Sequence, residues 1–459
     1  MSTPNLLGET PVEASAVPPP KLAAVPPAPP RLLCAERRQI RLVPTDLESL
    51  LPGDHPARAI WAVVERLDLS VLITPERSVL ITPERSVLIT PERCGFEAAI
   101  RARGEVAGRP AIDPRILVAL WLYATSEGIG SARELEELCG AHDAYRWICG
   151  GVPACAHTLS DFRVAHSRAL DDLLTEVLAI LKNQGLVDFK RTAQDGMKVR
   201  ASAGASSFRR KPSLEKCLEE ARQQVEAAQE TAEGSQQARA AARLRAAEDR
   251  VKRIQRALEL LPEVQAKKKP GERDKARVST TDPDARVMKM GDGGFRPAFN
   301  IQLSTDVGAR IIAGVDVDNG GNDYGRINPM LDQVSSRTGV LPTEALVDGG
   351  YADHGDIVSA AARKVDVYAP VPNARDKNTD PYLPRPDDPP AIAEWRRRMA
   401  TPEAKEIYKQ RASTAETSNA NLRCLKGLDR FRVRGISKVT CVVLWAVIAY
   451  DILRLISMT

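Results

Sequence analysis

The amino-acid sequence predicts an all-α domain followed by an α/β domain, which a charged helical segment interrupts. Three observations lead to this fold class. Apolar residues recur with helical spacing from 96 to 184, and from 186 onward they form the short apolar or alternating runs that are typical of strands. Residues 213–269 are rich in Glu, Gln, Ala and Arg and contain no proline before Pro262. This third pattern favours a helical hairpin, for which Gly234-Ser235 is the expected break.

Length and composition limit the class of protein. The chain has 459 residues, of which 43% are hydrophobic and 27% are charged, and this suits a globular protein of two or three domains. Its eight cysteines stand singly and its five histidines are scattered, so we expect no structural zinc site. Isolated cysteines and an N-terminus without a secretory signal pattern indicate a cytoplasmic protein.

Two N-terminal segments lie outside the globular pattern. Residues 1–35 are rich in proline and alanine, which predicts a disordered or polyproline-like tail. The octapeptide SVLITPER then occurs three times in tandem across residues 70–93. Because the unit is too short for a solenoid repeat, we interpret it as an expansion within a surface loop. A small β-rich docking segment is the alternative.

Residues 36–184 carry helix-start signals within the apolar periodicity. Asp113 before Pro114 predicts one N-terminus, Ser131 with Glu134 forms a capping box, and Thr158 is a candidate cap for a long helix that ends near Gly185. Compact helices joined by tight turns are compatible with two interpretations. One is a helix-turn-helix-like DNA reader and the other is a plain helical bundle. The arginines available to such a reader are Arg133, Arg146 and Arg163.

The α/β part, residues 186–459, contains five runs that predict strands. They are LVDFKRTAQDGMKVRA, FRPAFNIQLSTDV, ARIIAGVDVD, EALVDGGY and VDVYAPV. A loop rich in proline and aspartate follows Pro370, and helical patterns then continue to the C-terminus. The apolar run Val439–Ile448 is too short to span a bilayer, so it predicts a buried helix and no contact with a membrane.

The formal charge is only +5, but basic residues cluster between Lys190 and Lys211 and between Arg423 and Lys438. Such clusters neutralise backbone phosphates or form solvated basic faces. The candidates for phosphate contact are Arg200, Arg209, Arg210, Lys211, Arg430, Arg432, Arg434 and Lys438, with Arg296, Phe299 and Asn300 as weaker ones. Trp395 and Tyr351 are candidates either for the core or for stacking on DNA bases.

Three acids that are far apart in the sequence stand at positions that suit a catalytic site. Asp195 lies in a predicted strand, Asp348 ends an apolar run just before Gly349-Gly350, and Glu416 lies in a basic helix. Carboxylates from two strands and a helix suit a pair of divalent ions that act on phosphate esters. Taken singly, each acid also fits a turn residue or a surface ion pair.

The order of these motifs resembles the DDE transposases of bacterial insertion sequences. The resemblance extends from about Arg38 to the end of the chain. It rests on GRPAIDPRILVALWLYATSEGIGSARELEELC, YRWICGG and HTLSDFR in the helical part, and on QDGMKVRASA, TDPDARVMKMGDGGFRPAFNIQLSTD, VDGGYAD and the Tyr/Arg/Glu/Lys pattern around Glu416 in the second part. It implies a ribonuclease-H-like catalytic domain preceded by a helical domain that binds DNA.

The resemblance also implies roles for single residues. Asp195, Asp348 and Glu416 would be the catalytic acids that bind two Mg²⁺ (or Mn²⁺) ions. Tyr408 and Arg411 match the Tyr and Arg of the motif, and its Lys falls on Arg423, with Lys426 as a possible substitute. Asp323 fits a further acidic position.

The implied partners are DNA at the terminal inverted repeats, target DNA, and a second copy of the chain in the synaptic complex. The implied reaction is strand cleavage at the element ends followed by strand transfer. A decayed or domesticated copy that only binds DNA, and a ribonuclease-H-like nuclease, remain alternatives.

Overall fold

The structure is a computed structural model that describes residues 46–67, 111–233, 238–373 and 380–458. Residues 46–459 form one compact unit. The expectations for the tail 1–35, the repeat 70–93 and the break at Gly234-Ser235 lie outside the described residues.

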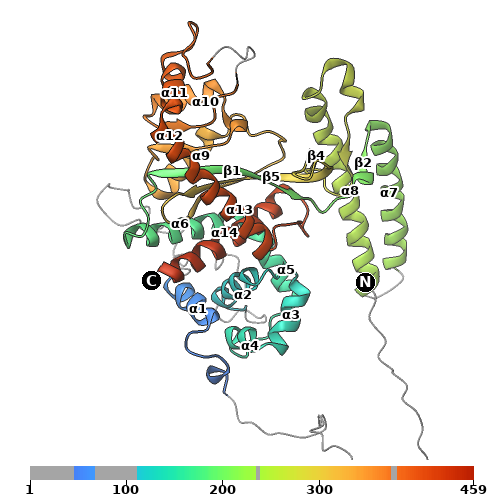
Figure 1. Ribbon diagram of the computed structural model, residues 1–459. Helices are drawn as coiled ribbons and strands as arrows, with labels where there is room; N and C mark the ends of the chain where they lie inside the picture. The colour runs from blue at the N-terminus through green and yellow to red at the C-terminus, as the bar shows by residue number, and fades with distance from the viewer. Residues whose placement is uncertain (1–45, 68–110, 234–237, 374–379, 459) are drawn as a thin grey trace, which may run out of the picture. The chain divides into compact units, whose positions relative to one another are not determined.

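Six helices form the first half of this unit (Figure 1). They are α1 (Pro56–Arg66), α2 (Pro114–Ser126), α3 (Ala132–Ala141), α4 (Asp143–Cys149), α5 (Ala156–Ala165) and α6 (Ser167–Asn183). Two predicted caps are confirmed, because Asp113 accepts a hydrogen bond from the Arg115 amide (2.8 Å) and Ser131 accepts one from the Glu134 amide (3.4 Å). The single long helix expected from Thr158 was wrong.

That helix is divided in two because the backbone leaves the helical region at His166. Cys155, rather than Thr158, precedes the first of the two helices. The apolar stripe of α6 is nevertheless buried as the periodicity predicted, and Leu170, Leu173 and Leu174 are fully enclosed. The change of direction at His166 therefore alters the path of the chain but keeps the apolar face on the core.

A mixed six-stranded sheet follows, in the order β4-β5-β1-β7-β8, with β6 also paired to β5. Its strands are β1 (Arg191–Arg200), β4 (Arg286–Lys289), β5 (Phe295–Asp306), β6 (Ile312–Asp318), β7 (Glu344–Leu346) and β8 (Asp366–Tyr368). The strand β1 lies at the centre, antiparallel to β5 and parallel to β7. All five predicted runs form strands, and β4 adds one that the sequence did not predict.

Helices α9 (Ile327–Thr338), α10 (His354–Ala362), α11 (Pro390–Ala400) and α12 (Pro402–Arg411) lie on one side of the sheet in Figure 1. On the other side lie α13 (Thr417–Leu425) and α14 (Ile436–Met458), together with α6. Trp395, Tyr351 and Phe299 are all buried in the core. The core interpretation of Trp395 and Tyr351 is therefore confirmed. Phe299 is also buried, so its ring is not exposed for contact with DNA.

The C-terminal helix α14 ties the helical part to the sheet. It packs against α2, α5, α6 and β6, and Trp445 donates a hydrogen bond to the Arg163 carbonyl (3.0 Å). The prediction that this segment is too short to span a bilayer was wrong, because the helix has 23 residues and is apolar enough by composition. Its most apolar window is 78% buried inside the protein, as expected of a core helix.

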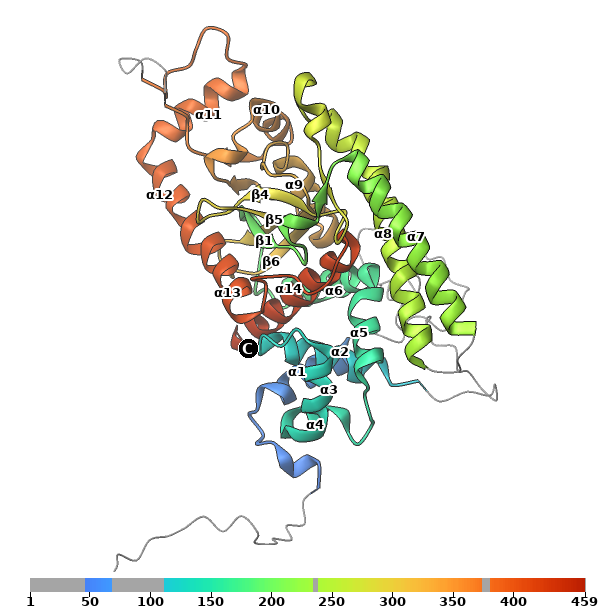
Figure 2. The ribbon, with the colours of Figure 1, turned by 90° about the vertical axis from the view of Figure 1, so that its right-hand side faces the viewer.

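The charged segment forms an antiparallel helical hairpin, α7 (Lys211–Glu233) and α8 (Ala238–Ala266), which enters the chain between β1 and β4. A two-stranded sheet of β2 (Phe208–Arg209) and β3 (Val278–Ser279) closes its base. The hairpin has a small core of its own, made of Leu214, Ala257, Leu261, Ala276 and Val278. Figure 2 shows α7 and α8 running side by side next to the sheet.

Candidate active site

Asp195 and Asp348 come from neighbouring strands. Asp195 lies in the middle of β1, opposite Leu303 of β5. Asp348 follows the end of β7, and its Oδ1 accepts a hydrogen bond from the Gly350 amide (2.7 Å), which starts the short turn Gly349–Tyr351. Because β1 and β7 are adjacent and parallel, the two carboxylates reach the same edge of the sheet.

Glu416 arrives from a helical segment that crosses this edge. The segment is not regular, because Ala412–Glu416 forms a π-helical turn between α12 and α13. Turns of this kind occur mostly as single interruptions of α-helices, often at functional sites. The widened turn brings residues five apart, such as Arg411 and Glu416, onto one face.

Arg411 joins the three acids. Its guanidinium lies 3.6 Å from Asp195 Oδ1, 3.7 Å from Asp348 Oδ2 and 3.4 Å from Glu416 Oε1. The arginine side chain is only 11% exposed, whereas that of Glu416 is 64% exposed. The structure therefore brings all three sequence-predicted acids together around a single cation, and Glu416 keeps the freedom to turn.

Two further residues of the crossing segment face the same site. Asn419 Nδ2 donates a hydrogen bond to Asp195 Oδ2 (2.8 Å), and Arg423 donates to the Lys198 carbonyl (3.4 Å). Glu416, Asn419, Ala420 and Arg423 share a face, as helical spacing requires, and together line a hollow of about 260 Å³ beside β1. No sequence pattern identified Asn419 as the residue that holds Asp195.

A fourth acid, Asp323, is held by β5. Its Oδ1 accepts hydrogen bonds from Asn300 Nδ2 (2.8 Å) and Gln302 Nε2 (2.6 Å). The hydroxyl of Tyr351 donates to Gln302 Oε1. Gln302 was missed in the sequence, although its spacing of two from Asn300 was a signal that both side chains share one face of the strand.

Glycine next to Asp195 leaves room for the side chains of Asp323 and Gln302 as they stand. A Cβ on Gly196 would lie 2.8 Å from Asp323 Oδ1 and 2.8 Å from Gln302 Nε2. These distances are too short for real contacts, so a side chain here would require the ends of Asp323 and Gln302 to shift. The pair Asp195-Gly196 therefore supplies both a carboxylate and the space for a second one.

The acids outnumber the cations that face them. Burial raises the pKa of Asp195 to about 6, the guanidinium of Arg411 lowers it, and the carboxylate of Asp348 raises it further. Burial also raises the pKa of Tyr408, which Arg411 lowers and Asp348 raises. A carboxylate held in this environment is stabilised when more positive charge enters the site.

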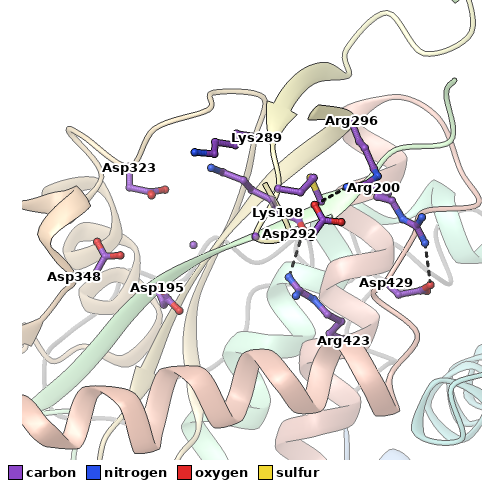
Figure 3. Close-up of a pocket in the computed structure, with 13 residues that line it drawn as sticks. Asp195, Lys198, Arg200, Lys289, Asp292, Arg296, Asp323, Asp348, Arg423 and Asp429 are labelled. Carbon is purple, nitrogen blue, oxygen red and sulfur yellow. Dashed lines mark hydrogen bonds and ion pairs between the residues drawn. The ribbon is translucent and has the colours of Figure 1, made fainter. Parts of the chain in front are cut away.

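A pocket of about 780 Å³ opens beside the acids. Figure 3 shows Asp195, Asp323 and Asp348 gathered at one end of it, while Arg200 and Arg296 lie at the other. Lys198, Lys289 and Arg423 also line it. At the far end Arg200 pairs with Asp429 (3.9 Å) and Arg296 with Asp292 (2.7 Å). Lys198, Lys289 and Arg423 make no ion pair among the described residues, so they are the cations of the pocket that a phosphate could pair with.

The remaining predicted basic residues lie elsewhere. Lys426 is buried and donates to the Ser126 carbonyl (2.9 Å), so its charge is used within the fold. Arg209, Arg210 and Lys211 are exposed at the base of the α7–α8 hairpin, and Arg432 and Arg434 are exposed in the loop before α14. The structure does not bring these five to the acids.

One candidate of the helical DNA reader is also used inside the fold. Arg163 lies over the ring of Trp121, with 4.6 Å between the guanidinium carbon and the ring centroid, and donates to the Gly130 carbonyl (2.5 Å). Arg146 pairs with Asp143 (2.9 Å). Of the three arginines proposed for DNA reading, Arg133 is the exposed one.

The donor set suits a hard divalent cation, because carboxylate oxygens are the ligands that Mg²⁺ and Mn²⁺ prefer. Within the described ranges, however, no group of three or more His, Cys, Asp or Glu side chains is close enough to hold an ion. Arg411 fills the space between the carboxylates instead. The residues present fit a metal once the exposed Glu416 turns inward and Arg411 gives way.

A mixed sheet with acids and cations facing one pocket defines a site for phosphate chemistry, and two family matches agree with it. A family described as a transposase domain (DUF772) matches residues 90–165, and one described as a transposase DDE domain matches residues 387–456. Curated proteins and solved structures give no match. The two matches together support a DDE transposase of insertion-sequence type, a class that generally uses divalent metal ions.

Proposed function

We propose that this transposase cleaves DNA at the ends of its element, and that the freed 3′-hydroxyl then attacks a phosphodiester of target DNA, so that the element end is joined to the target and the target's own 3′-oxygen leaves. The observation that carries the proposal is the convergence of Asp195, Asp348 and Glu416 on Arg411. Structural ion pairs seldom gather three acids around one cation at a pocket, whereas metal-dependent phosphoryl transfer requires such a set. The α/β domain would then be of the ribonuclease-H type that a DDE domain implies.

The three acids would hold two Mg²⁺ (or Mn²⁺) ions. Such ions lower the pKa of an attacking water or hydroxyl and compensate charge on the leaving oxygen. Asn419 fixes the carboxylate of Asp195 through its hydrogen bond, and the exposed Glu416 completes the set from the crossing helix.

The chain's own cations orient the DNA. Lys198, Arg200 and Arg423 line the pocket beyond the acids, where a backbone that enters the site would place its phosphates. Arg411, once released from the carboxylates, is placed to contact the phosphate that reacts. Since the reaction acts on two element ends that are brought together, we further propose that two copies of the chain act together on DNA in the cytoplasm.

Cleavage of the flanking DNA tests the proposal. The wild type should nick duplexes that carry the DNA at either side of the gene when Mg²⁺ is added. Asp195→Asn, Asp348→Asn and Glu416→Gln should each reduce nicking to background while they still bind the duplex. Asp292→Asn is the matched control, because Asp292 lines the same pocket but contacts Arg296 (2.7 Å) and the Gly294 amide (3.0 Å) and not Arg411.

Asp292→Asn should cut at close to the wild-type rate. Equal cutting by wild type and Asp348→Asn would overturn the proposed site. Specific end binding without cutting by any of these proteins would instead indicate a copy that retains only DNA recognition.

A further inference from the structure

The α7–α8 hairpin takes no part in the proposed chemistry, yet its charge is strongly divided. Helix α7 carries six acidic residues and three basic ones, whereas the stretch Arg239–Arg256 of α8 carries seven basic residues and two acidic ones. A hairpin that only packed against itself would pair these charges across its two helices. Among the described residues, no ion pair joins α7 to α8. The positive charge of α8 is therefore left for another partner.

One side of α8 faces the loop before α14. Arg253 lies on that side, where it interacts with Arg434, and it is half-buried with an Nε atom that has no hydrogen-bond partner among the described residues. Arg250, one turn earlier, donates a hydrogen bond to Gln224 of α7 (2.6 Å), so no described carboxylate neutralises its charge. Burial lowers the pKa of Arg253, and the guanidinium of Arg434 lowers it further, while Asp249 opposes both. Arg434 makes no ion pair within the described part of the chain. Two like charges face each other here without a carboxylate that pairs with them.

The same loop leads back to the pocket. The Phe431 amide donates to the Arg200 carbonyl (2.8 Å), and Arg430 forms a parallel bridge with Arg200. Arg200 and Asp429 both line the pocket at the end away from the acids (Figure 3). The loop thus carries Arg430, Arg432 and Arg434 from the basic end of the pocket toward α8.

We propose that Arg250 and Arg253 of α8, with Arg432 and Arg434, form a second binding surface for the phosphates of duplex DNA. This surface, here called the arm surface, holds the duplex beyond the pocket in which it is cut. The inference rests on the proposed function. DNA is favoured over an acidic protein segment because the arm surface continues the cationic end of the pocket along one stretch of chain, as a duplex backbone requires.

The salt dependence of DNA binding tests the arm surface. Wild type, Arg250→Gln/Arg253→Gln and Arg434→Gln would be titrated with a random-sequence duplex in metal-free buffer over a series of salt concentrations. Each lost phosphate contact reduces the slope of log K against log salt by about 0.9. The double variant should lose about 2 from the slope, and Arg434→Gln about 1, both with weaker binding.

Arg245→Gln/Lys252→Gln is the matched control, because it removes two charges from exposed positions of the same helix, about a third of a turn away from Arg250 and Arg253. Its slope should equal that of the wild type. Arg434→Gln covers the possibility that the double variant misfolds, since Arg434 is exposed in a loop. Equal slopes for Arg434→Gln and wild type would overturn the inference, and so would equal losses in the arm-surface and control double variants.

The result also separates the arm surface from the proposed function. If the wild type cuts end DNA but the arm-surface variants keep the wild-type slope, only the arm-surface proposal is disproved. If the wild type neither binds nor cuts DNA, both the arm-surface proposal and the proposed function are disproved. Loss of self-association in Arg250→Gln/Arg253→Gln, with an unchanged slope, would contradict the DNA assignment and point to the acidic α7 of a second copy.

Discussion

The electrostatics of the site depend mainly on one residue, Arg411. In the absence of metal its guanidinium is the cation nearest to Asp195, Asp348 and Glu416. A divalent ion placed among the same carboxylates would be repelled by it. Metal binding and the ion pairs of Arg411 with these acids are therefore expected to compete, and a DNA phosphate that draws the arginine away would favour the metal.

Arg411→Gln should consequently bind Mn²⁺ more tightly than the wild type when no DNA is present. Charges about 4 Å apart interact by a few kcal/mol near a protein surface, so a gain of about tenfold or more is expected. Calorimetric titration with Mn²⁺ measures it. Arg423→Gln is the control, since Arg423 lines the same pocket without an ion pair to the acids. Weaker Mn²⁺ binding by Arg411→Gln would show that the arginine supports the metal site.

The sequence was sufficient to single out the three acids that meet at Arg411, because the order of their motifs resembles a known family, although each acid taken singly also fitted a turn or a surface ion pair. It was not sufficient for the residues that hold them. Asn419 meets Asp195 across 224 positions of sequence, and Gln302 meets Asp323 across 21. Such contacts depend on strand register and on the rotation of a helix, which no local pattern encodes.

At the scale of elements, the strands and most helices followed from periodicity, while their interruptions did not. The π-helical turn Ala412–Glu416 has no local marker such as proline or glycine, yet it sets which side chains meet Arg411. The division of α5 from α6 at His166 was missed for the same reason. Both interruptions depend on packing between elements and were therefore invisible to a residue-by-residue pattern.

Helix α14 carries a buried acid that makes stability depend on pH. Asp451 is fully enclosed and accepts a hydrogen bond from the Ile312 amide of β6 (2.9 Å), while its Oδ2 has no partner among the described residues. Burial raises the pKa of this carboxyl well above its usual range, against the hydrogen bond from Ile312 and the charges of Arg337 and Arg454. The folded protein thus holds a proton that the unfolded chain releases near pH 4.

This contribution to stability is complete below about pH 4 and is lost as the pH rises through the folded-state pKa. Asp451→Asn keeps an acceptor for the Ile312 amide but cannot ionise. It should be more stable than the wild type near neutral pH, and the difference should vanish or reverse in acid. Urea denaturation of both proteins, near neutral pH and in acid, measures the difference in their free energy of unfolding. A variant that is equally destabilised at both would show that the charge of Asp451 is accommodated in the fold.

At the scale of the whole molecule, the helical part and the sheet share one hydrophobic core. Residues of α2, α6 and α14 pack into it together with β5 and β6. Composition and periodicity suggested two consecutive domains with a boundary at about residue 185. They carried no information on how the last helix returns to the first half of the chain. The contact between Trp445 and Arg163, for example, joins residues 282 positions apart.

A change of metal preference at Asp348 would show whether this residue binds a catalytic metal. Asp348→Cys replaces a hard oxygen ligand by sulfur, which Mg²⁺ does not accept and Mn²⁺ tolerates. End cleavage by Asp348→Cys should be lost with Mg²⁺ and recovered at least in part with Mn²⁺, while Asp292→Cys should cut with both ions. Equal activity of Asp348→Cys with Mg²⁺ and Mn²⁺ would contradict the assignment of Asp348 as a metal ligand.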